Sequence, residues 1–479
     1  MKILLLNLPH DLDDPDNCDS LVQPYGLVVL SSFLKSKGWD TTLYDAHGYG
    51  KNGQEILDYI VDLQPDIIGL TVYTCHLPQI VAFLAEVKKH LPKIQTVLGG
   101  PHPSSHEYKS LLLQNPCVDY CVIGEGEWSM HDLLLKLHNG ENADGVKGVA
   151  FLEGGEVEYA GSRDFIHDLD AMPFGDWESL PMDNYWAVAC EKKNLVNVLF
   201  SRGCVGRCSF CAARVTLGGA TRSRSPQSII EEVALLYEKH HARELAINDA
   251  TFNTDNEWAG QVAQKLIDYG KKDLVWTCNL RADNMDLETL KLMKKSGLTS
   301  VFIGVESGDD EMLASIQKGT TVAMIRSALA MLDEVGIKVY CGFILGLPGE
   351  TEESMQRTLA FSRELKKYSV AFSLATPFPG TVLYRKAQEE GFVVDDWARF
   401  DYHGIPYVPK GLTKEQLSSY YNKTVLRYYL SFHFLLRQVK QLRSWMQFKK
   451  TLRLGYRILV GRRKKLKEIQ KTSLPASNS

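Results

Sequence analysis

The stretch SRGCVGRCSFCAAR, residues 201–214, places Cys204, Cys208 and Cys211 in a C-x3-C-x2-C spacing directly after a predicted strand. Thiolates are soft ligands that suit iron–sulfur clusters or zinc. Structural zinc takes four closed ligands, usually from paired C-x2-C units, whereas no fourth Cys or His lies near this triad. Three thiolates can hold a [4Fe–4S] cluster and leave one iron open, so we predict such a cluster. An irregular zinc site or a chance grouping is the alternative.

The cysteine triad follows the first strand of six strand–helix repeats, which we predict to fill residues 196–385. The strands are expected at 197–202, 245–252, 275–280, 300–305, 338–346 and 372–378, and the helices at 226–240, 256–269, 286–296, 309–316, 322–335 and 351–367. Parallel repeats with this spacing predict a partial (β/α)6 barrel of the TIM type. Its site is then expected at the carboxyl ends of the strands.

Residues 1–140 show a second strand–helix alternation. We expect strands at 2–8, 41–46, 66–73, 96–101 and 120–127, with helices at about 25–38, 53–63 and 78–91. This pattern predicts an α/β fold with a doubly wound, Rossmann-like parallel sheet. Ligands of such sheets bind beyond the carboxyl ends of the strands.

Two further regions complete the predicted organisation. Residues 141–195 are interpreted as a linker that contains a hairpin, and residues 386–479 as a helical, basic C-terminal region. Positions 421–471 hold 15 Lys and Arg but a single acid, Glu468, although the whole chain has a net charge of −4. Helices with a solvated basic face are the simpler interpretation of this tail. Peripheral contact with an anionic membrane is the alternative, and no specific nucleic-acid partner is expected.

The triad, with Phe210 before its third cysteine, resembles the signature of the radical S-adenosylmethionine (SAM) superfamily. The resemblance implies that the open iron binds SAM and that one electron from an external flavodoxin- or ferredoxin-type donor splits it. Glycines at 203 and 206 allow the tight loop around the cluster.

Four later turns resemble family motifs in the expected order. LAINDATFN (245–253) resembles the second-strand motif, with Asn248-Asp249 in place of an acidic pair; GVESG (304–308), GFILGLPGET (342–351) and ATPFPGTVLY (375–384) resemble later ones. The resemblance implies contacts to SAM from Phe210, Asp249, Glu306, Ser307, Gly342, Ile344 and Gly346.

A doubly wound domain before such a barrel resembles the cobalamin-binding class of these enzymes, the B12-dependent class B type. The resemblance implies cobalamin contacts from Asp45, Thr71, Tyr73, Gly99, Gly100, His102, Gly124, Glu125, Gly126 and Glu127. Glycines at strand ends let a large macrocycle approach the backbone closely. A flavodoxin-like regulatory or nucleotide-binding domain is the alternative.

The segment Asp45 to Gly50 also matches D-x-H-x-x-G, by which other cobalamin proteins supply an axial histidine. In those proteins the motif follows the first strand, whereas here it follows the second. We interpret the match at His47 as coincidence and expect no histidine on cobalt. His10, His47 and His76 have no assigned role.

The resemblance implies a two-cofactor enzyme that methylates an unactivated carbon of a small molecule or natural product through methylcobalamin. A cobalamin-dependent oxidoreductase or cyclase, like the anaerobic magnesium-protoporphyrin monomethyl ester cyclase, is the second hypothesis, and a non-enzymatic cobalamin or Fe–S sensor is the third. Without a signal peptide, a long apolar run or clustered cysteine pairs, we expect a cytoplasmic enzyme with reduced thiols. No residue pattern identifies the substrate or a catalytic acid, base or radical relay.

Overall fold

The computed structural model describes residues 1–431 apart from 19, 188–189, 393, 395, 402–403 and 430. The chain divides into two units, residues 1–418 and 419–479, and both sheets belong to the first unit. Helix α14 (Lys414–Tyr429) crosses the boundary between the units.

The first sheet has seven strands in the order β3-β1-β4-β5-β6-β7-β8. Its parallel part consists of β1 (Lys2–Asn7), β3 (Asp40–Asp45), β4 (Ile67–Thr71), β5 (Gln95–Gly99) and β6 (Tyr120–Val122). Residues 3–6 of β1 are almost completely buried, as an apolar strand covered on both faces should be. The predicted doubly wound sheet is therefore confirmed.

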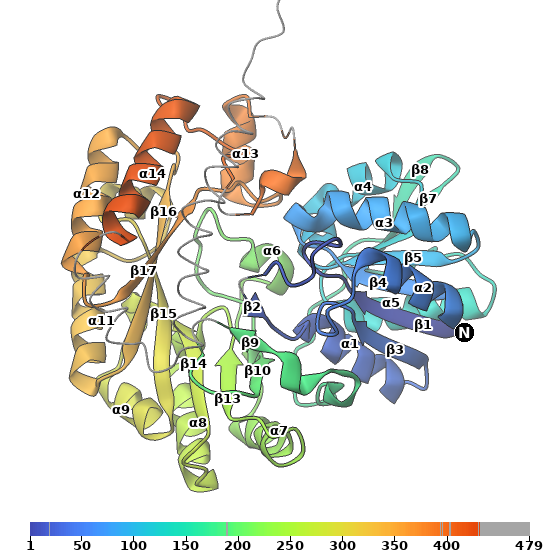
Figure 1. Ribbon diagram of the computed structural model, residues 1–479, viewed down its shortest axis with the longest axis horizontal. Coiled ribbons are helices and arrows are strands. Elements are labelled where there is room, and N and C mark those ends of the chain that lie inside the picture. Colours follow the sequence, from blue (N-terminus) through green and yellow to red (C-terminus); the bar gives the residue numbers. More distant parts are fainter. Residues whose placement is uncertain are drawn as a thin grey trace, which may run out of the picture. The chain divides into compact units, whose positions relative to one another are not determined.

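Helices surround this sheet (Figure 1). They are α1 (Tyr25–Ser36), α2 (Gly53–Leu63), α3 (Leu77–His90), α4 (Tyr108–Gln114) and α5 (Gly126–His138), with short turns η1 (Thr74–His76) and η2 (Pro103–Glu107). Helix α4 was not predicted; it is short and has no side-chain cap at its start.

The second sheet has six parallel strands in the order β10-β13-β14-β15-β16-β17. They are β10 (Leu195–Val198), β13 (Glu244–Ile247), β14 (Val275–Leu280), β15 (Leu298–Glu306), β16 (Lys338–Leu345) and β17 (Ser369–Leu374). In β14, Trp276, Cys278 and Leu280 are buried while the alternate residues are half-buried. One face of the strand therefore packs against helices, and the other faces the inside of the partial barrel.

Helices lie along the outer side of this sheet (Figure 1). They are α7 (Pro226–Lys239), α8 (Asn256–Tyr269), α9 (Leu287–Lys295), α11 (Val322–Val335) and α12 (Glu352–Glu364). Two shorter helices, α10 (Asp310–Ser315) and α13 (Val382–Glu389), follow β15 and β17 in the chain. Short turns are η3 (Trp177–Ser179), η4 (Met182–Asn184), η5 (Phe252–Thr254), η6 (Ala282–Asn284) and η7 (Trp397–Arg399). The six predicted barrel repeats are confirmed.

The region between the sheets differs from the prediction in two ways. The hairpin β7 (Val149–Glu153) and β8 (Glu156–Tyr159) extends the first sheet through antiparallel pairing of β6 with β7, so it is part of that sheet and not of a linker. The predicted strand 197–202 is two strands, because the chain leaves the sheet after Val198 and pairs again as β11 (Ser201–Arg202) with β12 (Arg222–Ser223). Another short pair, β2 (Ser20–Leu21) with β9 (Trp186–Ala187), ties the chain before α1 to the region before the barrel.

The basic tail predicted at 421–471 lies mostly outside the described residues, which end at 431. Within the described part of the chain, no helix combines the length and the apolar character needed to cross a membrane.

Candidate functional site

The three cysteines lie on a loop that is closed at its base by the β11–β12 pair. The Cys204 N–H donates to the Gly218 carbonyl at 3.2 Å, so the loop is also pinned from within. A second anchor comes from the barrel, where the Ser209 N–H donates to the Ile316 carbonyl at 2.9 Å. Helix α6 (Ala213–Leu217) follows the last cysteine. Backbone hydrogen bonds therefore fix the position of the loop that carries the three cysteines.

The three thiols are free and half-buried. Among the described residues, no three His, Cys, Asp or Glu side chains converge on one metal-ion position. In a cuboidal cluster each cysteine binds its own iron, so three thiolates can surround a [4Fe–4S] cluster. The three thiols of the loop fit that arrangement.

Cationic side chains from the barrel surround the cysteine loop. Nη1 of Arg281 lies 3.7 Å from the Cys208 sulfur, and Nη2 donates to the Lys318 carbonyl at 2.7 Å. The Lys318 ammonium is buried and pairs with Glu306 at 2.7 Å. Positive charge at this place offsets the negative charge of thiolates. Neither Arg281 nor Lys318 was predicted from the sequence, although Arg281 directly follows strand β14 and could have been noticed on that ground.

Several of the predicted SAM residues come together beside the loop. Phe210 and Ile344 pack against one apolar cluster, formed by Met312, Ile316, Leu347, Ala375 and Leu383. Gly342 lies under an aromatic ring, because a Cβ there would come within 2.6 Å of Phe302. Gly346 has a φ of +83° at the end of β16, and its N–H donates to the buried Glu350 carboxylate.

Other predicted SAM residues are occupied by structural contacts. Glu306 is engaged by Lys318, and Ser307 is buried with its hydroxyl 2.9 Å from that of Thr358 on α12. Asp249 is fully buried, and a contact from it to SAM stays a prediction. Its neighbour Asn248 is exposed and donates to Asn197.

Asp249 instead explains why the predicted first barrel strand is broken. Its carboxylate accepts from the Phe200 N–H and from the Ser201 hydroxyl, both at 2.7 Å. These bonds replace the strand pairing at the point where the chain turns toward Cys204. Burial raises the pKa of Asp249 from its ordinary value of 3.8 to about 6.

The raised pKa of Asp249 gives a pH prediction. Because the folded chain holds this proton more tightly than the unfolded chain, stability falls as the pH rises from about 4 to about 6, by about 3 kcal/mol from this group. Asp249→Asn removes that contribution. We therefore expect the variant's thermal midpoint to rise relative to wild type between about pH 4 and about pH 6. Thermal denaturation followed by circular dichroism in matched buffers measures the two midpoints. If the midpoints of wild type and variant changed in parallel with pH, the pKa of Asp249 would not be raised.

Gly203 supplies a second prediction, for closure of the loop. Its φ is +95°, and a Cβ there would lie 2.0 Å from the Ala220 carbonyl oxygen. Gly203→Ala should cost at least about 1–3 kcal/mol from the backbone conformation alone and displace the loop. We expect a several-fold fall in iron and sulfide bound after anaerobic reconstitution. Gly140→Ala is the control, because Gly140 has a φ of +73° but open space around it; equal iron in both variants would refute the prediction.

The predicted cobalamin residues lie around the carboxyl ends of β3, β4, β5 and β6. Tyr73 is 56% exposed, and at Gly124 a Cβ would meet nothing within 4 Å. Gly100, which follows Gly99 at the end of β5, has a φ of +92° and packs against Thr71 of β4. Glycines at these strand ends would let a large flat cofactor approach the backbone closely.

Other predicted cobalamin residues have different partners. Asp45 is fully buried, and its carboxylate accepts from Asn7 at 2.7 Å, Tyr185 at 2.7 Å and the Gly48 N–H at 3.0 Å. His102 is buried under the Trp397 ring, with centroids 5.0 Å apart, and burial lowers its pKa to about 4. Asp45 and His102 are therefore both buried residues that contact neighbouring segments at the carboxyl ends of the strands.

Glu125 and Glu127, beside Gly126 at the start of α5, are held in buried ion pairs, and their contact with cobalamin stays a prediction. Arg202 pairs with Glu125 at 3.0 Å and with Glu127 at 2.6 Å. Arg222 pairs with Glu125 at 2.9 Å from the opposite strand of the loop base. All four side chains are at most 13% exposed. The two carboxylates therefore hold the cysteine loop against the first sheet.

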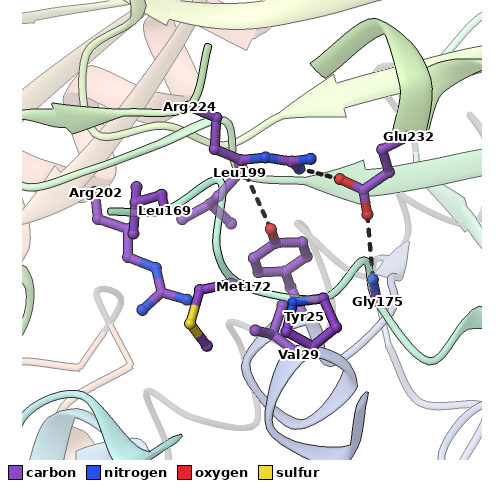
Figure 2. Close-up of a pocket in the computed structure, with 10 residues that line it drawn as sticks. Tyr25, Val29, Leu169, Met172, Gly175, Leu199, Arg202, Arg224 and Glu232 are labelled. Carbon is purple, nitrogen blue, oxygen red and sulfur yellow. Dashed lines mark hydrogen bonds and ion pairs between the residues drawn. The ribbon is translucent and has the colours of Figure 1, made fainter. Parts of the chain in front are cut away.

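Figure 2 shows further contacts that join α1 to the barrel near Arg202. The Tyr25 hydroxyl donates to the Leu199 carbonyl at 2.9 Å. Arg224 forms a buried ion pair with Glu232, whose other oxygen accepts from the Gly175 N–H at 3.3 Å. These residues line a pocket that is part of the junction between the two sheets.

Family models match the chain in both halves. The radical SAM superfamily model matches residues 198–362, and the B12 binding domain model matches residues 16–134. The chain belongs to the cobalamin-dependent radical SAM enzymes. Its cofactors are accordingly a [4Fe–4S] cluster, SAM and cobalamin.

Curated relatives match over most of the chain. A Pyrococcus horikoshii protein described as an uncharacterized methyltransferase is 28% identical over 92% of this chain and 95% of its own length. The anaerobic magnesium-protoporphyrin IX monomethyl ester cyclase of Rubrivivax gelatinosus is 28% identical over 78% of this chain and 67% of its own.

Solved structures agree on the fold. The radical SAM methyltransferase TsrM from Kitasatospora setae, with cobalamin and [4Fe–4S] cluster bound, has a TM-score of 0.69 at 17% identity and covers 88% of this chain and 91% of its own. The cobalamin-dependent radical enzyme OxsB, with aqua-cobalamin and SAM bound, also has a TM-score of 0.69, at 18% identity, and covers 95% of this chain and 75% of its own.

Proposed function

We propose that this chain methylates an unactivated carbon of a small molecule or natural product, using SAM and cobalamin. The observation that carries the proposal is the junction at Arg202. This residue lies two positions before Cys204 and pairs with Glu125 and Glu127 on the first sheet. The segment for the cluster and the sheet for cobalamin are thus tied together directly, as an enzyme that uses both cofactors on one substrate needs.

Curated relatives that are named as methyltransferases support methyl transfer over most of the chain. The Pyrococcus horikoshii protein named as a methyltransferase aligns with 92% of this chain, so the likeness includes both sheets. A cytidylyl-2-hydroxyethylphosphonate methyltransferase from Streptomyces wedmorensis aligns with 82% of it at 25% identity.

We assign the binding of the cluster to the cysteine loop and the barrel, and the binding of cobalamin to the first sheet. Cys204, Cys208 and Cys211 would hold the cluster, and Arg281 and Lys318 would offset its negative charge. When bound, the cluster supplies a radical from SAM and cobalamin supplies the methyl group. Phe210 and Ile344 form an apolar wall beside the loop, which would keep water from this side. An external one-electron donor of the flavodoxin or ferredoxin type would supply the electron that cleaves SAM.

The cyclase reaction is the second candidate. Anaerobic magnesium-protoporphyrin IX monomethyl ester cyclases from three organisms match this chain at 25–28% identity. The cited cyclase of Rubrivivax gelatinosus extends beyond the region that it shares with this chain, which spans 67% of its length. The methyltransferase likeness spans both proteins almost completely, and it is preferred for that reason.

A SAM turnover assay separates the two reactions. The intact chain is reconstituted anaerobically with iron, sulfide and hydroxocobalamin, then given SAM and a reductant. Methyl transfer predicts that S-adenosylhomocysteine forms together with 5′-deoxyadenosine, and that S-adenosylhomocysteine requires cobalamin. Formation of 5′-deoxyadenosine without any S-adenosylhomocysteine would reject methyl transfer and favour the cyclase reaction.

A further inference from the structure

Arg281 directly follows β14, and its guanidinium reaches the cysteine loop. Its Nε and Nη2 donate to the two carboxylate oxygens of Asp283, at 3.0 Å and 2.6 Å. Nη2 also donates to the Lys318 carbonyl at 2.7 Å. These bonds occupy one edge of the planar group, so the third nitrogen, Nη1, lies at the opposite corner. It is 3.7 Å from the Cys208 sulfur.

The surroundings of Arg281 hold its guanidinium in this orientation. A Cβ on Gly206 would come within 2.7 Å of Nη1, and one on Gly319 would lie 3.4 Å from Nη2. The backbone of Arg281 is held as well, because its N–H donates to the Asn253 side chain at 2.9 Å. Only 14% of the Arg281 side chain is exposed. The donor is therefore fixed in place beside Cys208.

Within the described part of the chain, one other side chain lies within hydrogen-bond distance of a sulfur of the triad. The Thr251 hydroxyl is 3.7 Å from the Cys204 sulfur, but it donates its proton to the Ala250 carbonyl at 2.7 Å. A hydroxyl has a single proton to donate. Arg281 is thus the side chain that offers a charged N–H to a thiolate of the triad.

Lys318, the other cation beside the loop, has a different arrangement. Its ammonium pairs with Glu306 at 2.7 Å, and both side chains are at most 10% exposed. The carboxylate therefore neutralises this charge inside the barrel. The acid that pairs with Arg281 is more exposed, at 25% for Asp283, and it lies on the edge of the guanidinium away from Cys208. The positive side of the Arg281 pair faces the sulfur.

We propose that Arg281 raises the reduction potential of the [4Fe–4S] cluster through an N–H···S hydrogen bond to the Cys208 thiolate. Hydrogen bonds to the sulfurs and the net charge around them set such potentials. Reduction takes one electron from the external donor and breaks no bond, so the cluster becomes more negative by one charge. A cationic donor stabilises that state more than the oxidised one. The inference rests on the cluster of the proposed function, and it holds for either candidate reaction.

A potentiometric titration followed by electron paramagnetic resonance measures this potential. The intact chain is reconstituted anaerobically with iron and sulfide and titrated without SAM. Arg281→Gln should bind as much iron and sulfide as wild type. Its ratio of reduced to oxidised cluster at a given potential should be about tenfold lower, the order expected for a hydrogen bond to a charged group. For a one-electron couple this corresponds to a midpoint lower by about 59 mV. An unchanged midpoint would overturn the proposal.

Arg207→Gln is the matched control, because it removes the same charge from an exposed residue of the same loop. Water screens an exposed charge, so its midpoint should stay close to that of wild type. Arg281→Lys keeps the charge but loses the fork of donors, and its midpoint should fall between those of wild type and Arg281→Gln. Equal shifts in Arg207→Gln and Arg281→Gln would mean that total charge sets the potential, and would reject the hydrogen bond to Cys208.

A nitrogen-isotope measurement on the wild-type chain decides the matter if Arg281→Gln binds no cluster. Pulsed electron paramagnetic resonance of the reduced cluster should show a nitrogen coupling that changes when the protein contains nitrogen-15 arginine. Absence of any arginine coupling would overturn the proposal. A wild-type chain that binds no iron would overturn the cluster assignment and this inference together, whereas normal iron with an unchanged potential in Arg281→Gln contradicts only the role of Arg281.

Discussion

Cys208→Ala is expected to lower 5′-deoxyadenosine formation to below about one hundredth of wild type, because loss of residues that merely support a metal ligand already costs about 10–100-fold. Cys208 lies nearest to the Arg281 guanidinium, at 3.7 Å, so its loss also leaves that cation without its sulfur partner. Liquid chromatography of the anaerobic SAM reaction measures the nucleoside. Bound iron should fall in parallel, which a colorimetric iron assay reports.

Cys341→Ala is the matched control for this experiment. Cys341 is a completely buried thiol on β16, and we interpret it as part of the core. Its replacement should cost stability through the small cavity that it leaves, but it should retain bound iron and SAM cleavage. If Cys208→Ala kept its activity, the assignment of the cluster to this loop would fail.

Arg202→Ala should cause the largest loss of stability among the substitutions considered. Removing one partner of a buried ion pair costs about 3–5 kcal/mol, because the remaining charge is left uncompensated. Here Glu127 loses its only ion-pair partner in the described chain, and Glu125 keeps Arg222. Thermal denaturation followed by circular dichroism should show a midpoint several degrees lower than in wild type.

Two further variants separate the ion pair from a general surface effect. Adding Glu127→Gln to Arg202→Ala removes the uncompensated charge and should recover part of the loss. Arg326→Ala breaks an exposed pair with Glu364, in which both side chains are more than half exposed. Such pairs contribute at most about 1 kcal/mol, so this control should melt close to wild type. Equal losses in Arg202→Ala and Arg326→Ala would contradict a buried junction.

Features that depend only on residues close together in the chain could be predicted from the sequence. The cysteine spacing is local, and the alternation of strands and helices follows from hydrophobic periodicity, so both were predicted. Helix α4 was missed because seven residues without a side-chain cap leave little local signal. The break after Val198 was also missed, since it depends on Asp249, whose carboxylate reaches back almost fifty positions.

The roles of charged residues were the hardest to predict. Glu125 and Glu127 stand at a strand end, where a cofactor contact is a reasonable expectation, but their partners Arg202 and Arg222 lie more than seventy residues away. Arg281 and Lys318 reach the cysteine loop only because the barrel closes around it. The contact between the rings of His10 and His76 likewise requires the strand order, because the two residues are 66 positions apart in the chain.

The most direct test of the proposed reaction follows the methyl group itself. The reconstituted chain is incubated with SAM that carries a trideuteromethyl group and with a small-molecule extract of the organism that encodes it, and the products are compared by mass spectrometry. Methyl transfer predicts a compound that gains one trideuteromethyl group only when both cobalamin and the intact cysteine triad are present. A product that forms under the same requirements without any deuterium would contradict methyl transfer.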